Sequence, residues 1–280
     1  MDYILLDSGN KKKLEQIGPY RLVRPAQNAV WKPVLSEAEW AGVNGIFERD
    51  STGGGRWKWL RGGVAPSWNV DLDFFNMLVK PTDFGHLGFF PEQYSNWQWL
   101  KKNVSGFGAQ PKVLNLFAYS GASSLAAASA GANVCHVDAA KGMVDWAKEN
   151  LKLNSEIPER IRWITDDVIK FVNREIRRGS LYNGIILDPP SFGRGSQGQV
   201  WKLEDDIMPF LELCGQIIDK KSPYFVIISC HSQGFSPSVL SRLLCDVFSS
   251  KGEIQSGEML INEKNGREFA AGSYSRLLCR

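Results

Sequence analysis

Four acidic residues and one cysteine come directly after short apolar runs in the C-terminal half of the chain. Carboxylates can accept hydrogen bonds from ribose hydroxyls or from base amino groups, and a thiolate can attack carbon as a nucleophile. The residues are Asp138 after Val134–Val137, Asp166 and Asp167 after Ile161–Thr165, Asp188 after Gly184–Leu187, and Cys230 after Phe225–Ser229. We therefore expect a site that binds a nucleotide-like group and carries out chemistry beside it.

The apolar runs alternate with segments of helical length from Pro111 onward. Each run is too short for a helix and rich in branched residues, which predicts a buried strand. The predicted strands are Val113–Phe117, Val134–Val137, Ile161–Thr165, Gly184–Leu187 and Phe225–Ser229, and the predicted helices are 122–130, 141–153, 168–178, 203–219 and 236–248. This alternation predicts an α/β fold with a doubly wound, mostly parallel sheet. Ligands bind beyond the carboxyl ends of the strands in such a sheet, which is where the acids and the cysteine stand.

The first predicted strand continues into a run of mostly small residues before the next helix. Small residues let the backbone approach a ligand, and a helix N-terminus offers N–H groups to anionic groups. The run is Phe117, Ala118, Tyr119, Ser120 and Gly121. No GxGxxG motif is present, so a simple tight turn is the alternative to a cofactor-binding loop.

The acids at the ends of the second and third strands have two interpretations each. Asp138 can accept both hydroxyls of a ribose, or it can cap the following helix. Of the next pair, we assign Asp167 to the ligand, near an adenine amino group, and Asp166 to the helix cap.

Two prolines follow the acid at the end of the fourth strand. They lack N–H donors and fix the turn, so Asp188 and the carbonyls of Pro189 and Pro190 are expected to face a substrate as acceptors. A stiff loop without a binding role is the alternative. At the fifth strand, Cys230 is the candidate nucleophile. We expect His231 to point away from the site because adjacent side chains on a strand face opposite ways.

Two basic segments are candidates for contacts with phosphate or bases. Arg194 and Lys202 flank the Gly193–Gly198 loop, which places them to meet phosphate. The segment 56–63, Arg-Trp-Lys-Trp-Leu-Arg-Gly-Gly, interleaves cations with aromatic rings as base-stacking platforms do. Its alternative is a strand whose tryptophans pack inward and whose cations are solvated.

Composition narrows the function classes. The 280 residues include 33 Lys and Arg against 30 Asp and Glu, a net charge of +3 that permits a nucleic-acid partner without requiring one. Five cysteines without a CxxC pair and only three histidines argue against a disulfide framework or a metal site. No apolar run is long enough for a membrane span, and the first residues do not form a signal peptide. We expect a cytoplasmic protein.

Short runs between glycine and proline turns predict antiparallel β-structure in the N-terminal part. We expect a β-rich domain at 1–80 and a sheet domain at 111–280. Between them, residues 81–110 are expected to form a hairpin and a connecting helix, and the helix covers Glu92–Val104. Asn265-Gly266 predicts a hairpin turn between Glu253–Ile261 and Phe269–Leu278.

Taken together, these motifs resemble the class I S-adenosylmethionine-dependent methyltransferases. Within that class they look most like the bacterial family that contains the 23S rRNA 5-methylcytosine methyltransferases. The resemblance rests on Phe117–Gly121, Asp138, Asp166-Asp167, Asp188–Phe192, Ser229-Cys230 and Gly88–Gln93, the last being similar to the hairpin that precedes the family's catalytic domain. It covers about residues 80–280, and its fold is a Rossmann-like sheet with a C-terminal antiparallel hairpin.

The resemblance implies S-adenosylmethionine as cofactor and RNA, in particular ribosomal RNA, as partner. It implies that Gly121 lies in the methionine loop, Asp138 on the ribose, Asp167 near the adenine, and Gln93 at the cofactor site. The chain departs from the family at two places. Residues 1–80 do not match the RNA-binding module of PUA type, and His231 stands where a serine is usual.

Three functions remain open from the sequence. The first is methylation of cytosine C5 in RNA, with Cys230 adding to C6 and Asp188 holding the polar edge of the base. Pro189, Pro190, Phe192, Arg194 and Lys202 would then line the substrate side. The second is methylation at guanine N7 or an exocyclic amine, although Ser191 replaces the stacking aromatic usual for amine acceptors. The third is RNA binding without turnover.

Overall fold

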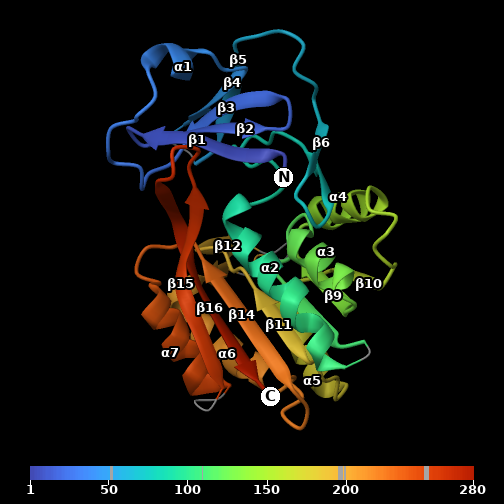
Figure 1. Cartoon of the computed structure of the whole chain (residues 1–280). Helices are drawn as coiled ribbons and strands as arrows, with labels where there is room; N and C mark the ends of the chain where they lie inside the picture. The colour runs from blue at the N-terminus through green and yellow to red at the C-terminus, as the bar shows by residue number, and fades with distance from the viewer. Residues whose placement is uncertain (51–52, 109, 195–197, 199, 249–251) are drawn as a thin grey trace. The chain divides into compact units, whose positions relative to one another are not determined.

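The computed structural model describes residues 1–50, 53–108, 110–194, 198, 200–248 and 252–280, and it shows two compact units (Figure 1). The N-terminal unit comprises Met1–Glu92 and Leu260–Ala271, and the sheet unit comprises Gln93–Met259 and Gly272–Arg280. The expected domain limits at residues 80 and 110 remain predictions.

A seven-stranded sheet in the order β10-β9-β8-β11-β14-β16-β15 forms the centre of the sheet unit. The strands are β8 (Lys112–Leu116), β9 (Asn133–Asp138), β10 (Ile161–Thr165), β11 (Gly184–Leu187), β14 (Tyr224–Cys230), β15 (Glu253–Asn262) and β16 (Glu268–Cys279). The first five pair in parallel, and β16 pairs antiparallel to β14. The predicted fold class is therefore confirmed, including the C-terminal hairpin.

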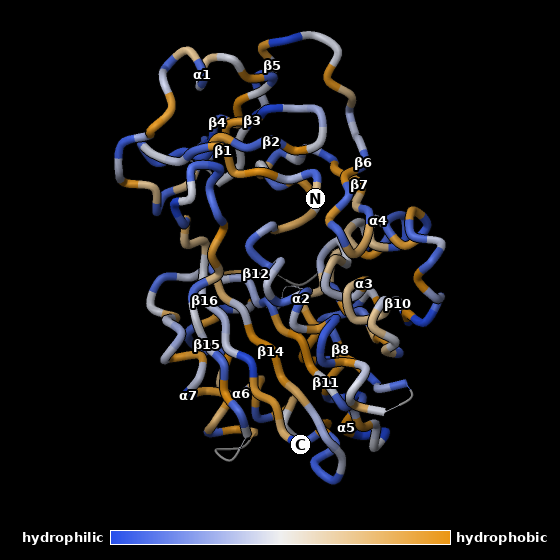
Figure 2. Tube along the Cα trace, in the orientation of Figure 1, coloured by the Kyte–Doolittle hydropathy of each residue, from blue (hydrophilic) through white to orange (hydrophobic). Residues whose placement is uncertain are grey.

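Helices cover both faces of this sheet (Figure 1). They are α2 (Tyr94–Asn103), α3 (Ala122–Ser129) and α4 (Lys141–Lys152) on one face, and α5 (Val168–Arg177), α6 (Leu203–Gly215) and α7 (Pro237–Val247) on the other. The hydrophobic core on the α5–α7 side takes alternate residues of each strand, such as Val226, Ile228 and Cys230 of β14. Strands β11 and β14 are buried on both faces, and Figure 2 shows them as apolar runs.

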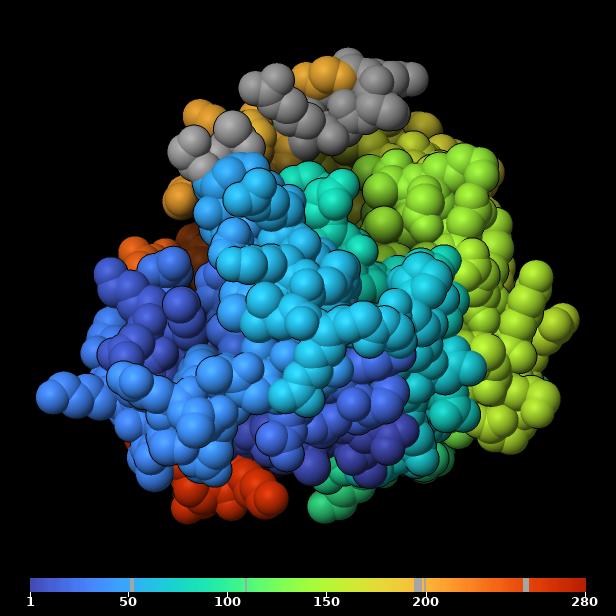
Figure 3. Space-filling view, turned by 90° about the horizontal axis from the view of Figure 1, so that it is seen from above, coloured from blue at the N-terminus to red at the C-terminus, as the bar shows by residue number. Residues whose placement is uncertain are grey.

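The N-terminal unit contains a five-stranded sheet in the order β1-β2-β3-β4-β5 and a separate pair β6-β7. Its elements are β1 (Tyr3–Gly9), β2 (Lys12–Ile17), β3 (Tyr20–Pro25), α1 (Glu37–Ala41), β4 (Gly45–Arg49), β5 (Gly55–Trp59), β6 (Trp68–Asp71) and β7 (Asn76–Val79). Figure 3 looks onto this unit, coloured blue to cyan. The expected antiparallel pairing is wrong between β3 and β4, which are parallel, because the connection containing α1 returns the chain in the same direction.

Several local expectations also need correction. The segment expected as a hairpin before the sheet unit is a loop that ends in a 3-10 turn, η1 (Pro91–Gln93), and a second 3-10 turn, η2 (Val104–Phe107), follows α2. The predicted helix 203–219 ends at Gly215, and the small hairpin of β12 (Phe192–Arg194) and β13 (Val200–Lys202) was not predicted. Within the described residues, no helix is long and apolar enough to cross a membrane, and no cluster of metal-ligating side chains occurs.

Candidate active site at the carboxyl edge of the sheet

The loop after β8 is held in an unusual backbone conformation. Phe117 and Tyr119 have φ values of 56° and 51°, and Gly121, the N-cap of α3, has a φ of 93°. Non-glycine residues in the left-handed region are strained, and such strain clusters at functional sites. A Cβ on Gly121 would lie 2.9 Å from the Cβ of Ala147 on α4, so the close approach of the two helices also requires glycine. Ala118 and Ser120 are buried within this loop.

The carboxylate of Asp138 is fixed at the end of β9 by the neighbouring loop. The N–H of Tyr119 donates to Oδ2 and the N–H of Ala140 donates to Oδ1, each at 2.8 Å. Burial raises the pKa of Asp138, and these two hydrogen bonds oppose the shift. The N-cap of α4 is Ala140, so the helix-cap alternative for Asp138 is not what the structure shows. Each carboxylate oxygen retains a second lone pair with which it could accept a ribose hydroxyl.

The helix cap after β10 is the other acid than the one expected, and the ligand role of either acid stays a prediction. Asp167, not Asp166, is the N-cap of α5, where its side chain accepts a hydrogen bond from the N–H of Lys170. Asp166 instead pairs with Arg174, whose Nη2 lies 2.7 Å from Oδ2. The sequence could not distinguish them because both acids precede the helix and both are favourable caps.

A compact hydrogen-bonded cluster surrounds Asp188 beyond β11. Gln93 donates from Nε2 to Asp188 Oδ2 at 2.9 Å, and Ser229 donates from Oγ to Asp188 Oδ1 at 2.8 Å. The same Gln93 amide also contacts Ser229 Oγ at 2.8 Å. The structure thus brings together the ends of β11 and β14 and the start of α2, and it places Gln93 on Asp188.

His231 lies beside this cluster, which contradicts the expectation that it points away. Its Nε2 is 3.7 Å from Asp188 Oδ1. The expectation failed because β14 ends at Cys230, so the alternation of a strand no longer applies to the next residue. A polar residue directly after a buried strand was the signal that could have identified it.

The prolines after Asp188 are tied to a tryptophan from β13. Trp201 donates from Nε1 to the Pro190 carbonyl at 2.7 Å, and the N–H of Leu203 donates to the Ser191 carbonyl at 3.0 Å. One lone pair of the Pro190 carbonyl is therefore used, and contact of its second lone pair with a substrate stays a prediction. Trp201 also packs on Phe117, with ring centroids 5.0 Å apart, and so joins this turn to the loop after β8. Pro189 is buried, whereas Phe192 is 51% exposed.

Cys230 ends β14 on the apolar side of the sheet. The residue is 1% exposed and belongs to the core that packs against α5–α7. Burial raises the pKa of its thiol, the N–H of Ser232 opposes the shift with a hydrogen bond of 3.3 Å to Sγ, and Asp188 raises the pKa further. The thiol is thus adjacent along the chain to both Ser229 and His231, but its surroundings favour the protonated form.

Of the two cations expected to meet phosphate, Lys202 is partly engaged at the start of α6. Its Nζ is 3.8 Å from Asp205, and its backbone N–H donates to Asp206 at 2.7 Å. Arg194 ends β12, but its side chain lies outside the described part of the chain, as does most of the Gly193–Gly198 loop.

The tryptophans of the basic segment 56–63 stack on each other in the N-terminal unit. The rings of Trp57 and Trp59 are 5.1 Å apart and inclined by 7°. Trp57 packs against Phe47 and donates to the Thr82 carbonyl, whereas Trp59 remains 40% exposed at the edge strand β5. The packed-strand interpretation thus holds for Trp57 and for the exposed Arg56 and Lys58 but not for Trp59, and stacking on bases stays a prediction.

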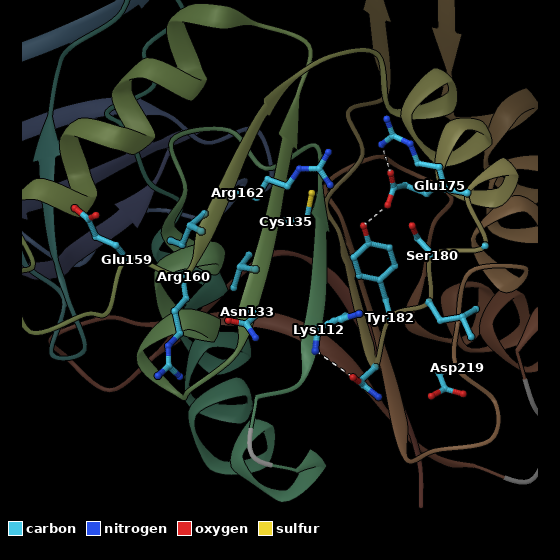
Figure 4. Close-up of a pocket in the computed structure, with 16 residues that line it drawn as sticks. Lys112, Asn133, Cys135, Glu159, Arg160, Arg162, Glu175, Ser180, Tyr182 and Asp219 are labelled. Carbon is cyan, nitrogen blue, oxygen red and sulfur yellow. Dashed lines mark hydrogen bonds and ion pairs between the residues drawn. The ribbon is translucent and has the colours of Figure 1, made fainter.

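A separate cleft of about 950 Å³ lies at the amino ends of the parallel strands, away from the residues described above. Figure 4 shows Lys112, Asn133, Arg162 and Tyr182 around it. Its lining mixes basic with acidic side chains and contains none of the expected site residues. Parallel sheets bind ligands at the other edge, so we do not assign this cleft to the chemistry.

Comparison with known proteins identifies the group to which this arrangement is similar. A family profile described as S-adenosylmethionine-dependent methyltransferase matches residues 43–212. The crystal structure of an S-adenosylmethionine-dependent methyltransferase from Agrobacterium tumefaciens is 39% identical, with a TM-score of 0.93 over 100% of this chain and 91% of that one.

Two curated relatives match shorter stretches of the chain. The ribosomal RNA large subunit methyltransferase K of Neisseria meningitidis is 34% identical over 98 residues, which are 35% of this chain and 28% of the relative. The ribosomal RNA large subunit methyltransferase I of Aeromonas salmonicida is 34% identical over 110 residues, which are 39% of this chain and 27% of the relative. Each match therefore spans less than a third of the relative's own length.

Proposed function

The chain belongs to the S-adenosylmethionine-dependent methyltransferases, and from this premise we propose that it transfers a methyl group to a base in ribosomal RNA. The observation that carries the proposal is the cluster around Asp188, which presents a fixed acceptor at the carboxyl edge of the sheet beside the loop after β8. Two curated relatives are named as methyltransferases of large-subunit ribosomal RNA, which supports RNA as the substrate.

The residues around the loop after β8 suit the cofactor of this family. S-adenosylmethionine supplies an electrophilic methyl group on a positively charged sulfur. We propose that the backbone at Gly121 lies against its methionine part, because the loop after β8 is held in left-handed conformations at the carboxyl edge of the sheet, where ligands bind. Asp138, oriented by two backbone N–H groups, would accept the ribose hydroxyls. The adenine role of Asp167 stays a prediction, since its side chain caps α5.

The exposed aromatic and basic side chains of the N-terminal unit also suit contacts with RNA. Trp59 presents a half-exposed ring on the stacked pair with Trp57, and Arg56 and Lys58 add positive charge on the same strand. An exposed aromatic ring stacks on any unpaired base, and cations attract the backbone. We assign this segment to RNA contacts as part of the proposal.

We propose cytosine C5 as the position that is methylated, with Cys230 as the nucleophile. The Cys230 thiol gives its proton to solvent, the thiolate adds to C6, and the electrons of the C5=C6 bond move to C5. C5 would then take the methyl group as the methyl–sulfur bond of the cofactor breaks and its electron pair stays on the sulfur. His231, whose Nε2 lies 3.7 Å from Asp188, then removes the C5 proton. The C5–H electrons re-form the double bond and expel the Cys230 thiolate, so that the enzyme is regenerated.

A nitrogen acceptor, with guanine N7 foremost, is the second candidate. The burial of Cys230 and its raised pKa favour it, because a buried, protonated thiol is a weak nucleophile. Nitrogen methylation needs only positioning of the base, and it leaves Cys230 as part of the core.

The experiment incubates the protein with labelled S-adenosylmethionine and unmodified ribosomal RNA, then identifies the labelled nucleosides by mass spectrometry. Label in 5-methylcytidine supports the first candidate, and label in a methylguanosine supports the second. No label in RNA under conditions in which the protein binds S-adenosylmethionine would contradict RNA methylation.

Two variants test the separate steps of the covalent route, which are the addition of Cys230 and the removal of the C5 proton by His231. Cys230→Ala is expected to abolish transfer to cytosine while leaving cofactor affinity unchanged. His231→Asn is expected to leave the RNA attached to Cys230, visible as a slower band on a denaturing gel, because the C5 proton then has no acceptor. Full turnover by Cys230→Ala would refute the covalent route.

A further inference from the structure

A chain of hydrogen bonds connects Asp188 to the C-terminal strand through α2. Arg276 of β16 donates from Nε to Asn96 Oδ1 at 2.7 Å. Asn96 donates from Nδ2 to Gln93 Oε1 at 2.7 Å, and Gln93 donates from Nε2 to Asp188. The four residues lie in the sheet unit and, apart from Asp188, are buried.

The direction of this chain is determined at both ends, by a guanidinium that only donates and by the Asp188 carboxylate that only accepts. A guanidinium has only donors, so Asn96 must turn its oxygen toward Arg276 and its amide nitrogen toward Gln93. Gln93 must then turn its oxygen toward Asn96 and its nitrogen toward Asp188. Without the guanidinium, Asn96 could rotate by half a turn and set its oxygen against the oxygen of Gln93. That repulsion would favour the opposite Gln93 orientation, which presents an oxygen to the Asp188 carboxylate.

Burying the Arg276 guanidinium at this position lowers the stability of the fold, which indicates that the residue has a role beyond stability. It is 7% exposed, and among the described residues no carboxylate forms an ion pair with it. Its other contacts are with Ser95 Oγ at 2.9 Å and with the ring of Tyr274, 4.1 Å from the guanidinium carbon. A buried charge without a counter-charge is unfavourable, so an apolar residue would suit the fold better.

We propose that Arg276 and Asn96 are positioning residues of the methyl-transfer site, which act through Gln93 to keep an N–H donor, and never a carbonyl oxygen, against Asp188. The inference rests on the proposed role of Asp188 and deepens it. It predicts that the direction of the hydrogen bonds, and not merely the packing of Asn96, sets the turnover rate.

The test is Asn96→Asp, which changes one atom type and keeps the shape. The introduced carboxylate accepts from Arg276 and gains an ion pair with it, so thermal unfolding should stay unchanged or shift to higher temperature. The same carboxylate cannot donate to Gln93 and competes with Asp188 for the Gln93 nitrogen, so the orientation with the Gln93 oxygen toward Asp188 becomes populated. We expect kcat for RNA methylation to fall about tenfold or more, the effect of losing one charge-assisted hydrogen bond.

Ser95→Ala is the matched control, because it removes the other hydrogen bond of Arg276 and leaves the chain to Asp188 intact. We expect its kcat to remain within about twofold of the parent, a change that corresponds to well under one ordinary hydrogen bond. Arg276→Lys, which also only donates, should retain more activity than Arg276→Gln, which can present either an oxygen or a nitrogen to Asn96.

Asp188→Asn distinguishes a failure of the positioning role of Asn96 and Arg276 from a failure of the proposed role of Asp188. An inactive Asp188→Asn protein together with a fully active, folded Asn96→Asp protein would overturn the inference and leave the proposed function standing. An active Asp188→Asn protein would overturn the proposed role of Asp188, and the inference with it. A lower kcat in Asn96→Asp at unchanged thermal stability, with Asp188→Asn inactive, supports both.

Discussion

Replacing Gly121 by alanine tests whether the loop after β8 and helix α4 are held as close as the structure indicates. The φ of 93° at this residue costs a non-glycine side chain about 1–2 kcal/mol. The added Cβ would lie 2.9 Å from the Ala147 Cβ, and overpacking of this kind costs about 1–3 kcal/mol. The expected loss of unfolding free energy for Gly121→Ala is therefore about 2–5 kcal/mol.

A second glycine, beyond the other end of α3, isolates the backbone contribution. Gly131, just beyond α3, has a φ of 99° and no atom within 4 Å of an added Cβ. Gly131→Ala should therefore lose only the conformational part, about 1–2 kcal/mol. The double variant Gly121→Ala/Ala147→Gly should recover the crowding part, which appears as a coupling of about 1–3 kcal/mol in a double-mutant cycle.

Urea unfolding of Gly121→Ala, Ala147→Gly, their double variant and Gly131→Ala measures the stability terms, and calorimetric titration of S-adenosylmethionine measures the effect on cofactor binding. We expect Gly121→Ala to bind the cofactor more weakly than Gly131→Ala, because only the first lies in the loop assigned to the methionine part. A coupling below about 0.5 kcal/mol would refute the reasoning, since it would mean that α4 moves aside without cost.

Two further predictions concern ionisable side chains and their buried surroundings. The Nη2 of Arg267 lies 2.7 Å from both Asp7 and Glu263, two buried carboxylates. Arg267→Met removes this guanidinium and should lower the free energy of unfolding in urea by about 3 kcal/mol. Arg267→Lys keeps the charge and should lose clearly less stability, so equal losses in the two variants would contradict an electrostatic role. Burial lowers the pKa of His136 from 6.5 to about 3, so the unfolded chain takes up the proton first and stability falls with decreasing pH across this window. The slope is about 1.4 kcal/mol per pH unit, and His136→Gln should remove it, whereas an unchanged acid slope in that variant would assign the effect to other groups.

The sequence predicted the sheet unit well because strand and helix periods are local signals. Each predicted strand end lies within a residue of the observed one, which placed Asp138 and Asp188 correctly at the carboxyl edge. Capping by Asp167 could not be separated from capping by Asp166, since the choice depends on where the first helical turn closes and on the ion pair with Arg174.

Long-range contacts account for what the sequence could not predict. Trp201 reaches the Pro190 carbonyl only because β12 and β13 fold back as a hairpin, and neither strand carries a strong local pattern. Arg276 meets Asn96 across 180 residues of chain, so no spacing rule could have linked them. His231 was misplaced by a single residue, because the alternation was extended past the end of β14.

The return of residues 260–271 to the N-terminal unit has a consequence for synthesis on the ribosome. Asp7 is paired with Arg267, 260 residues later in the chain, and the buried Glu263 comes from the same late segment. Chains grow at about 5–20 residues per second, so the first strand waits roughly 10–50 s for these partners. The part made first is therefore among the last to be completed, and we expect chaperone binding to nascent chains to persist until the C-terminal hairpin has left the exit tunnel.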